Sequence, residues 1–316
     1  SRVGANPNPN PNPNPAPLGL AHRPSSLLSC PPMSRTTDFP LPQALPEPRG
    51  LGGTARKDRW WIAPLAVFLG LSAFIVYSTW AAFQGDHYYL TAGGAHYLSP
   101  FYSPVIWDQV GMTSGHAWFG PKPEWWPGWL LFSPALLILW APGGFRFTCY
   151  YYRGAYYKSF WAAPMSCSVG KPIKGYRGEQ RIPLILQNIH RYFLYLALAF
   201  IGVLLWDAIK GYTFTTVDEA GAATTTFGVG VGSLVLTVNV ILLAGYTFGC
   251  HSLRHIVGGG LDIISRKPVR KKCYDCVSCL NRRHMTWAWM SLFWVGFSDA
   301  YVRLCSHGIW TDWRII

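Results

Sequence analysis

Residues 227–256 read FGVGVGSLVLTVNVILLAGYTFGCHSLRHI, an apolar run that ends in a short string rich in cysteine and histidine. The run holds no Lys, Arg, Asp or Glu before Arg254. About 20 apolar residues are enough for an α-helix to cross a bilayer. The stretch therefore predicts a membrane-spanning helix that carries ligand-type side chains at one end.

Four other runs have a similar length and character. With the first, the expected helices cover about residues 60–83, 125–150, 182–209, 227–255 and 284–309. The second contains Pro127, Pro134 and Pro142, which we expect to bend it, as packed membrane helices tolerate. The chain is 50% hydrophobic and 13% charged, whereas a soluble domain carries roughly 25% charged residues. These features predict an all-α integral membrane protein with five transmembrane helices.

Lys and Arg are distributed unevenly among the segments that connect these helices. They precede the first helix and fill the second-to-third and fourth-to-fifth connections, while the other two connections hold only Lys122 and Lys210. Basic connections stay in the cytoplasm, so the N-terminus is predicted to be cytoplasmic and the C-terminus external. The segment Gln84 to Glu124 is then a long outer loop, expected to fold as a structured cap. The net charge of +13 is explained by topology and does not indicate nucleic-acid binding.

Residues 1–55 form a separate region. They begin with an Asn-Pro repeat at 6–15 and continue rich in Pro and Ser. Such a composition cannot bury a core, so an extended or disordered tail is expected before a transmembrane domain at 56–316.

Cysteine and histidine side chains gather on the predicted cytoplasmic face. His251 and His255 are four residues apart, so both rings lie on one face of a helix and could hold one metal. Cys149 and Cys167 are expected at the same level. Two His on one iron and two Cys on the other is the Rieske pattern of a [2Fe–2S] cluster, whose raised potential suits electron delivery to a quinone. Cys250 points about 100° away from His251 on a helix, so it is a weaker candidate for the same cluster.

His190 and His284 support a second interpretation. Membrane cytochromes bind haem through His residues on facing helices, so a haem b could use His190 with His251 or His284. Cys273, Cys276 and Cys279 form C-x2-C-x2-C, a spacing found in zinc and iron–sulfur sites, but no fourth cysteine adjoins it. A metal role for these three thiols is left open.

An aromatic and basic segment adjoins the cysteine and histidine residues. A quinone headgroup fits aromatic walls with a few hydrogen-bond donors. The predicted quinone neighbourhood is Tyr152, Arg153, Gln187, His190 and Arg191. An ordinary interfacial aromatic belt is the alternative.

At these residues the chain resembles a known family. The strings FRFTCYYYR at 145–153, PLILQNIHRY at 183–192 and CHSLRHI at 250–256 resemble the membrane anchor of succinate dehydrogenase of the haem-free class with a membrane-embedded Rieske-type cluster. The resemblance covers about residues 56–316. In it, His251 and His255 correspond to the pair of histidines that bind the cluster.

The resemblance implies a specific place in the respiratory chain. A flavoprotein and an iron–sulfur subunit would dock on the cytoplasmic face of the cell membrane, and this chain would pass electrons from succinate to quinone. The resemblance does not decide whether several such complexes assemble into a higher oligomer. The alternatives are a haem b anchor of the same type of complex, or a non-redox scaffold or transporter. A transporter usually shows internal repeats and charged residues at mid-membrane, and neither is evident in the sequence.

Overall fold

The computed structural model describes residues 53–109, 111, 114–163, 169–170, 181–182, 184–217, 222–261 and 263–316. The chain divides into two compact units, residues 1–45 and 46–316, and all described residues belong to the second. The predicted tail at 1–55 therefore lies almost wholly outside the described residues.

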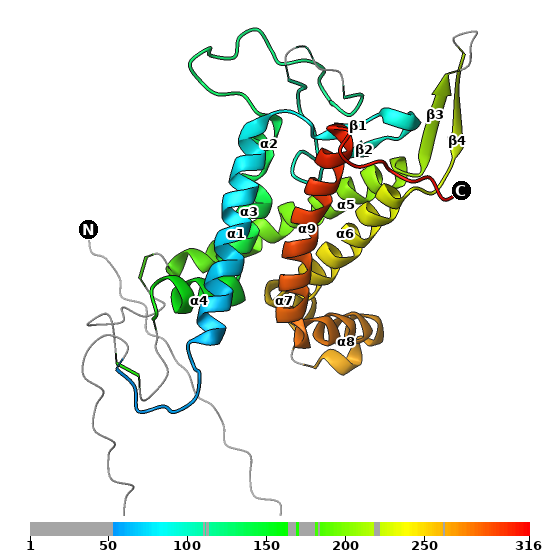
Figure 1. Ribbon diagram of the computed structural model, residues 1–316. Coiled ribbons are helices and arrows are strands. Elements are labelled where there is room, and N and C mark those ends of the chain that lie inside the picture. The colour runs from blue at the N-terminus through cyan, green and yellow to red at the C-terminus, as the bar shows by residue number, and fades with distance from the viewer. Residues whose placement is uncertain are drawn as a thin grey trace, which may run out of the picture. The chain divides into compact units, whose positions relative to one another are not determined.

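The second unit is mostly helical, with two small antiparallel hairpins (Figure 1). The α-helices are α1 (Ile62–Gln84), α2 (Pro134–Ile138), α3 (Trp140–Thr148), α4 (Tyr150–Phe160), α5 (His190–Lys210), α6 (Val231–Phe248), α7 (His251–Gly258), α8 (Pro268–Arg282) and α9 (His284–Ser306). The 3-10 helices are η1 (Ala92–Gly94), η2 (Leu184–Ile189) and η3 (Ile264–Arg266), and the strands are β1 (Tyr89–Leu90), β2 (Tyr97–Leu98), β3 (Thr213–Val217) and β4 (Ala223–Phe227).

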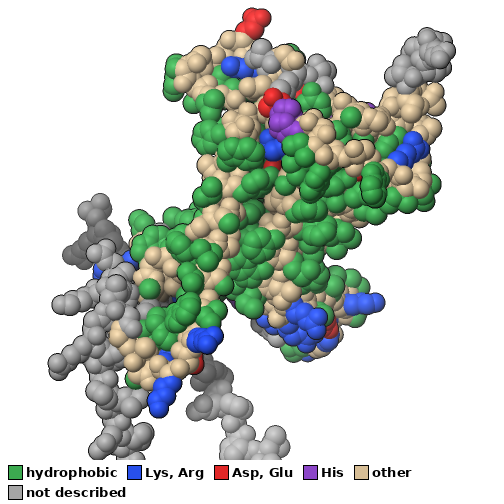
Figure 2. All heavy atoms as spheres, viewed as in Figure 1, with side chains coloured by type: hydrophobic (Ala, Val, Ile, Leu, Met, Phe, Trp, Pro, Cys, Tyr) green, Lys and Arg blue, Asp and Glu red, His purple; other side chains and the backbone are tan. Residues whose placement is uncertain are grey.

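Three of the described helices, α1, α5 and α6, are long and apolar enough to cross a membrane. By length and hydropathy, three membrane-spanning helices are therefore found among the described residues, where the sequence predicted five. The helix α9 has 23 residues but is less apolar than these three. Figure 1 places α4, α7 and α8 at one end of the bundle and both hairpins at the other. Figure 2 shows hydrophobic side chains over the middle of the unit and a cluster of Lys and Arg on the end formed by α8.

The predicted second helix, 125–150, is wrong as a single element. Residues 125–133 are not helical, and the chain then forms α2, α3 and α4 in succession. Pro134 is the first residue of α2. Proline is tolerated there because the N–H of the first helical residue has no partner within the helix. Pro142 has no N–H to give to the carbonyl of Ile138, and α2 ends at that residue. Cys149 has extended backbone angles, φ −61° and ψ 131°, and separates α3 from α4.

The predicted fourth helix, 227–255, also divides into separate elements. Residues 223–227 form β4, which pairs with β3 in a hairpin that the all-α prediction did not include. Runs of Thr on both strands favour extended structure because β-branched side chains fit a pleated surface. The helix α6 ends at Phe248, and Cys250 is extended, with φ −67° and ψ 138°, before α7 begins. The other three predictions differ mainly at their ends; the third begins as η2 before α5.

Described parts of the predicted outer loop pack against the helices as expected. Tyr88 and Tyr102 are fully buried there, and their rings stack 4.4 Å apart. Their cluster includes Ala81 of α1 and Val295 of α9. The loop therefore covers the end of the bundle opposite α8 (Figure 1).

The C-terminal segment closes the same end. Asp312 accepts hydrogen bonds from Tyr97, at 2.9 Å, and Tyr301, at 2.6 Å. The backbone N–H of Gly232, in the first turn of α6, also donates to Asp312 at 2.8 Å. A carboxylate is favoured at a helix N-terminus because of the partial positive charge there. One side chain thus joins the outer loop, α6 and α9.

Candidate functional site

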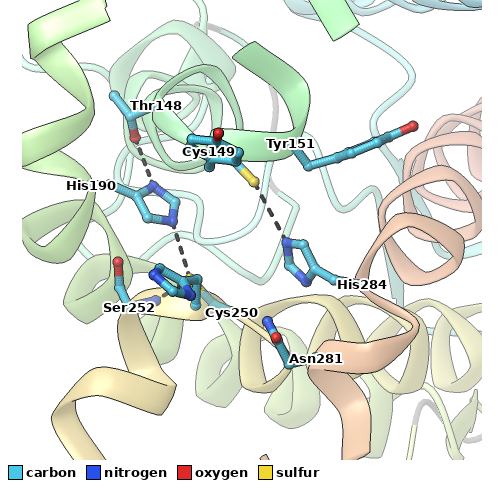
Figure 3. Close-up of a pocket in the computed structure, with 10 residues that line it drawn as sticks. Thr148, Cys149, Tyr151, His190, Cys250, Ser252, Asn281 and His284 are labelled. Carbon is cyan, nitrogen blue, oxygen red and sulfur yellow. Dashed lines mark hydrogen bonds between the residues drawn. The ribbon is translucent and has the colours of Figure 1, made fainter. Parts of the chain in front are cut away.

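A cavity of about 570 Å³ lies at the α7 end of the bundle (Figure 3). Five of its lining side chains are ligand types held near the junctions of helices: Cys149, His190, Cys250, His251 and His284. The remaining lining residues are Thr148, Tyr150, Tyr151, Ser252 and Asn281.

The backbone presents the two thiols and two of the imidazoles in a repeated arrangement. Each cysteine is the extended residue between two helices, Cys149 between α3 and α4 and Cys250 between α6 and α7. Each histidine is the first residue of a long helix, His190 of α5 and His284 of α9. The segment from α3 to α5 and the segment from α6 to α9 therefore each contribute one such cysteine and one such histidine.

The side chains pair across these two segments. Nε2 of His190 lies 3.1 Å from Sγ of Cys250, and Nε2 of His284 lies 3.5 Å from Sγ of Cys149 (Figure 3). His190, Cys149 and Cys250 are all buried. The cavity thus has two N···S pairs facing it, contributed by four different elements.

Neighbouring side chains fix the orientation of both rings. The Phe145 ring stacks on His190 at 4.7 Å, and the Tyr246 ring stacks on His284 at 5.0 Å. The hydroxyl of Thr148 donates its one proton to the carbonyl of Gly144 at 2.7 Å. That hydroxyl therefore accepts from Nδ1–H of His190 at 2.8 Å, which leaves Nε2 of His190 unprotonated and directed at Cys250. Sequence reasoning missed Thr148, although it directly precedes Cys149.

One polar atom in the site has no partner. Nδ1 of His284 is buried and makes no hydrogen bond within the described part of the chain. A histidine that binds a metal usually donates its second ring N–H to another group. His190 satisfies that rule through Thr148, and His284 does not, so the two histidines differ in their supporting contacts.

The ligand set predicted from sequence is only partly brought together. Cys149 and His251 line the cavity, while His255 lines a different hollow beside α8. Cys167 lies outside the described residues. His251 and His255 instead contact each other on the exposed side of α7, with their Nε2 atoms 3.0 Å apart. Burial, then the charges of His255 and Arg254, lower the pKa of His251.

The C-x2-C-x2-C motif is not part of the cavity. Cys273, Cys276 and Cys279 are exposed thiols on α8. Within the described residues, no three His, Cys, Asp or Glu side chains converge closely enough to hold a single metal ion. The motif stays without an assigned ligand.

A second cavity, of about 440 Å³, adjoins the first and is lined by α1, α3 and α4. Thr148 lines both cavities. Of the predicted quinone neighbourhood, Arg153 lines the second cavity and His190 lines the first. Tyr152 is fully buried behind the wall, and its hydroxyl donates to the carbonyl of Ala288 at 2.5 Å.

The other two residues of that neighbourhood are not placed in either cavity. Arg191 is exposed on α5, and the Gln187 side chain lies outside the described residues. Arg146, which sequence reasoning did not select, lines the second cavity and donates to Ser291 at 2.9 Å.

The chain is similar to known proteins over most of its length. The family model for the actinobacterial succinate dehydrogenase subunit SdhC matches residues 62–308. The chain is 42% identical to a chain of the Mycobacterium smegmatis Sdh1 complex in the apo form, with a TM-score of 0.73. That similarity covers 88% of this chain and 97% of the other. No curated protein matches the chain significantly.

Proposed function

The chain belongs to the actinobacterial succinate dehydrogenase SdhC family, and from this premise we propose that it carries electrons toward quinone with a Rieske-type [2Fe–2S] cluster as its redox centre. The flavoprotein and iron–sulfur subunits would dock on the basic surface of α8 (Figure 2). The basic residues of that surface support a cytoplasmic position. The membrane would be the plasma membrane.

The observation that carries the proposal is a cavity lined by two thiols, each in contact with an imidazole, Cys250 with His190 and Cys149 with His284. A mononuclear site needs three or four ligands around a single point, which the described residues do not provide. A binuclear cluster takes two protein ligands on each iron, so four donors spread around one cavity suit it. We therefore assign Cys149, Cys250, His190 and His284 as the ligands. We prefer His190 and His284 to His251 and His255 because their Nε2 atoms lie 3.1 and 3.5 Å from the two thiols. We prefer Cys250 to Cys167 because Cys250 lines the cavity, while Cys167 lies outside the described residues.

When bound, the cluster supplies one-electron redox chemistry. The residues of the chain hold its ligands in place and limit solvent. Thr148 keeps the proton of His190 on Nδ1, so Nε2 is available as a donor. The rings of Phe145 and Tyr246 cover the two imidazoles. Apolar surroundings of this kind lower the local dielectric and help set a reduction potential.

We assign the second cavity to the quinone. Its walls are aromatic, with Tyr156, Tyr157 and Trp161 among them, and Arg153 adds a cationic group. Thr148 forms part of both cavities, so a headgroup here would lie next to the ligand His190. This proximity supports direct electron transfer between the two sites.

Five spans remain part of the proposal. The helices α1, α5 and α6 supply three. The fourth would be α9, whose 23 residues at about 1.5 Å each could cross a hydrocarbon core. The fifth would be the bent stretch α2–α4, whose broken backbone lines a cavity, the setting in which membrane proteins tolerate it.

The spectrum of the purified complex tests the cofactor. We expect the dithionite-reduced complex to show a low-temperature EPR signal with a lower average g value than all-cysteine clusters give, because imidazole replaces thiolate on one iron. No haem absorption should accompany it. A Soret band with sharp reduced α bands would instead establish the haem b alternative, in which His190 binds haem together with His251 or His284. A complex without iron in this chain would favour a scaffold.

The assignment of the quinone cavity predicts the effect of filling it. Gly143 lines this cavity, and a Cβ placed there meets no atom within 4 Å. Gly143→Leu should therefore be accommodated by the backbone while its side chain takes space from the headgroup. We expect KM for a soluble quinone to rise about tenfold, equivalent to about 1.4 kcal/mol of binding. Steady-state kinetics with quinone as the varied substrate measures it.

A matched control is available on the next helix. A Cβ at Gly154 of α4 also meets no atom within 4 Å, and Gly154 does not line the cavity. Gly154→Leu should leave the quinone KM unchanged. Equal effects of the two variants, or an unchanged KM in Gly143→Leu, would reject this cavity as the quinone site.

A further inference from the structure

The histidine pair of α7 is separate from the four ligands assigned above. His251 and His255 are both exposed, and Nε2 of one lies 3.0 Å from Nε2 of the other. Their rings are nearly perpendicular, at 76°, with centroids 4.4 Å apart. The two nitrogen atoms therefore lie within hydrogen-bond distance of each other at the surface.

This separation matches the spacing of two nitrogen ligands on one metal ion. Metal–nitrogen bonds of about 2.0–2.1 Å at a right angle would place the nitrogen atoms about 2.9 Å apart. A tetrahedral angle would place them about 3.3–3.4 Å apart with the same bonds. The observed 3.0 Å lies nearer the right angle, which is the tetragonal geometry of Cu²⁺ and Ni²⁺.

The surroundings leave these two nitrogen atoms accessible to a cation. The charged neighbour Arg254 is held away from them, because its guanidinium donates to the hydroxyl of Ser278 at 3.1 Å and lies over the Tyr274 ring at 5.1 Å. We propose that His251 and His255 form a chelating site for a divalent first-row transition-metal ion, with water in its remaining positions.

A second histidine pair in the chain provides a contrast. His87 and His307 stack face to face, with centroids 3.6 Å apart and planes 21° apart. Lone pairs of imidazole nitrogens lie in the ring plane, so two stacked rings do not direct them at a common ion. This pair is therefore a control for simple histidine content.

Cu²⁺ titration of the purified complex, followed by EPR, tests the site. All samples carry Cys273→Ser, Cys276→Ser and Cys279→Ser, so that exposed thiols do not compete for the ion or reduce it. The difference spectrum of the oxidised complex should show one Cu²⁺ with hyperfine splitting from two nitrogens. His255→Gln and His251→Gln should each lose the two-nitrogen pattern, and affinity should fall at least about tenfold, because one of the two protein donors is gone.

Three results would overturn the proposal: no two-nitrogen signal in the parent complex, its persistence in both single variants, or its loss in His307→Gln. The first would be expected if His251 and His255 already bound the iron–sulfur cluster. A cluster that is absent, or held by residues other than His251 and His255, would leave the result at α7 unaffected, so these two failures are distinguishable.

Discussion

Replacing both His190 and His284 with alanine is expected to abolish quinone reduction while the complex still oxidises succinate with a soluble artificial acceptor. The two imidazoles are half of the assigned donor set around the cavity. Without them, one iron of a cluster would have no protein ligand, so the cluster should not assemble. Quinone reduction should fall by at least about 100-fold, because removing ligands costs no less than removing their supporting contacts, which alone typically costs 10–100-fold.

Two further variants separate a chemical effect from a loss of fold. Cys149→Ser and Cys250→Ser keep the side-chain shape and remove the thiolate that iron prefers. Each should lose the EPR signal assigned to the cluster. In the same assays, His251→Ala combined with His255→Ala should retain both the signal and the quinone activity. Loss of the signal in that pair, with retention in His190→Ala and His284→Ala, would restore the ligand set predicted from the sequence.

The sequence predicted where ligand-type residues would gather more reliably than how they would pair. Apolar length and the distribution of Lys and Arg indicated which helix ends lie together, and Cys149, His190, Cys250 and His284 all line one cavity. The argument against Cys250 assumed one continuous helix through it, and this assumption was wrong. An extended residue at this position removes the 100° relation to His251 on which that argument depended.

Backbone breaks limited the prediction of the fold in the same way. Cys149 and Cys250 are not proline or glycine, and Gly249, the C-cap of α6, was the one local signal of a helix end beside them. The contacts that hold them are long-range, with His284 and His190 respectively. The hairpin of β3 and β4 was missed for a different reason. A search for apolar runs assigns Thr-rich residues such as 223–226 to a loop, although their β-branched side chains favour strands.

Removing the carboxylate of Asp299 should cause the largest loss of stability of any single change considered. Asp299 is fully buried and pairs with Arg303 one turn later on α9, at 3.4 Å. It also accepts hydrogen bonds from Tyr77 of α1, at 2.6 Å, and from Ser99 of the outer loop. Asp299→Ala would leave the Arg303 charge buried without its partner, which costs about 3–5 kcal/mol in comparable cases.

The remaining contacts of Arg303 do not compensate for that loss. Its guanidinium donates to the carbonyl of Asp86 at 2.8 Å and lies over the Trp80 ring at 5.3 Å. Neither group carries the negative charge that Asp299 supplies. We therefore expect the detergent-solubilised complex carrying Asp299→Ala to have a clearly lower melting temperature. Thermal unfolding monitored by tryptophan fluorescence measures it.

A second ion pair with the same spacing is the matched control. Lys271 and Asp275 are also one turn apart, at 2.7 Å, but both are exposed on α8. Exposed pairs contribute about 0–1 kcal/mol, so Asp275→Ala should change the melting temperature little. The double variant Asp299→Leu with Arg303→Leu should melt above Asp299→Ala, because it leaves no unpaired charge. A double variant that melts lower than Asp299→Ala would show that the polar contacts of Arg303, and not its pairing with Asp299, hold this end of α9.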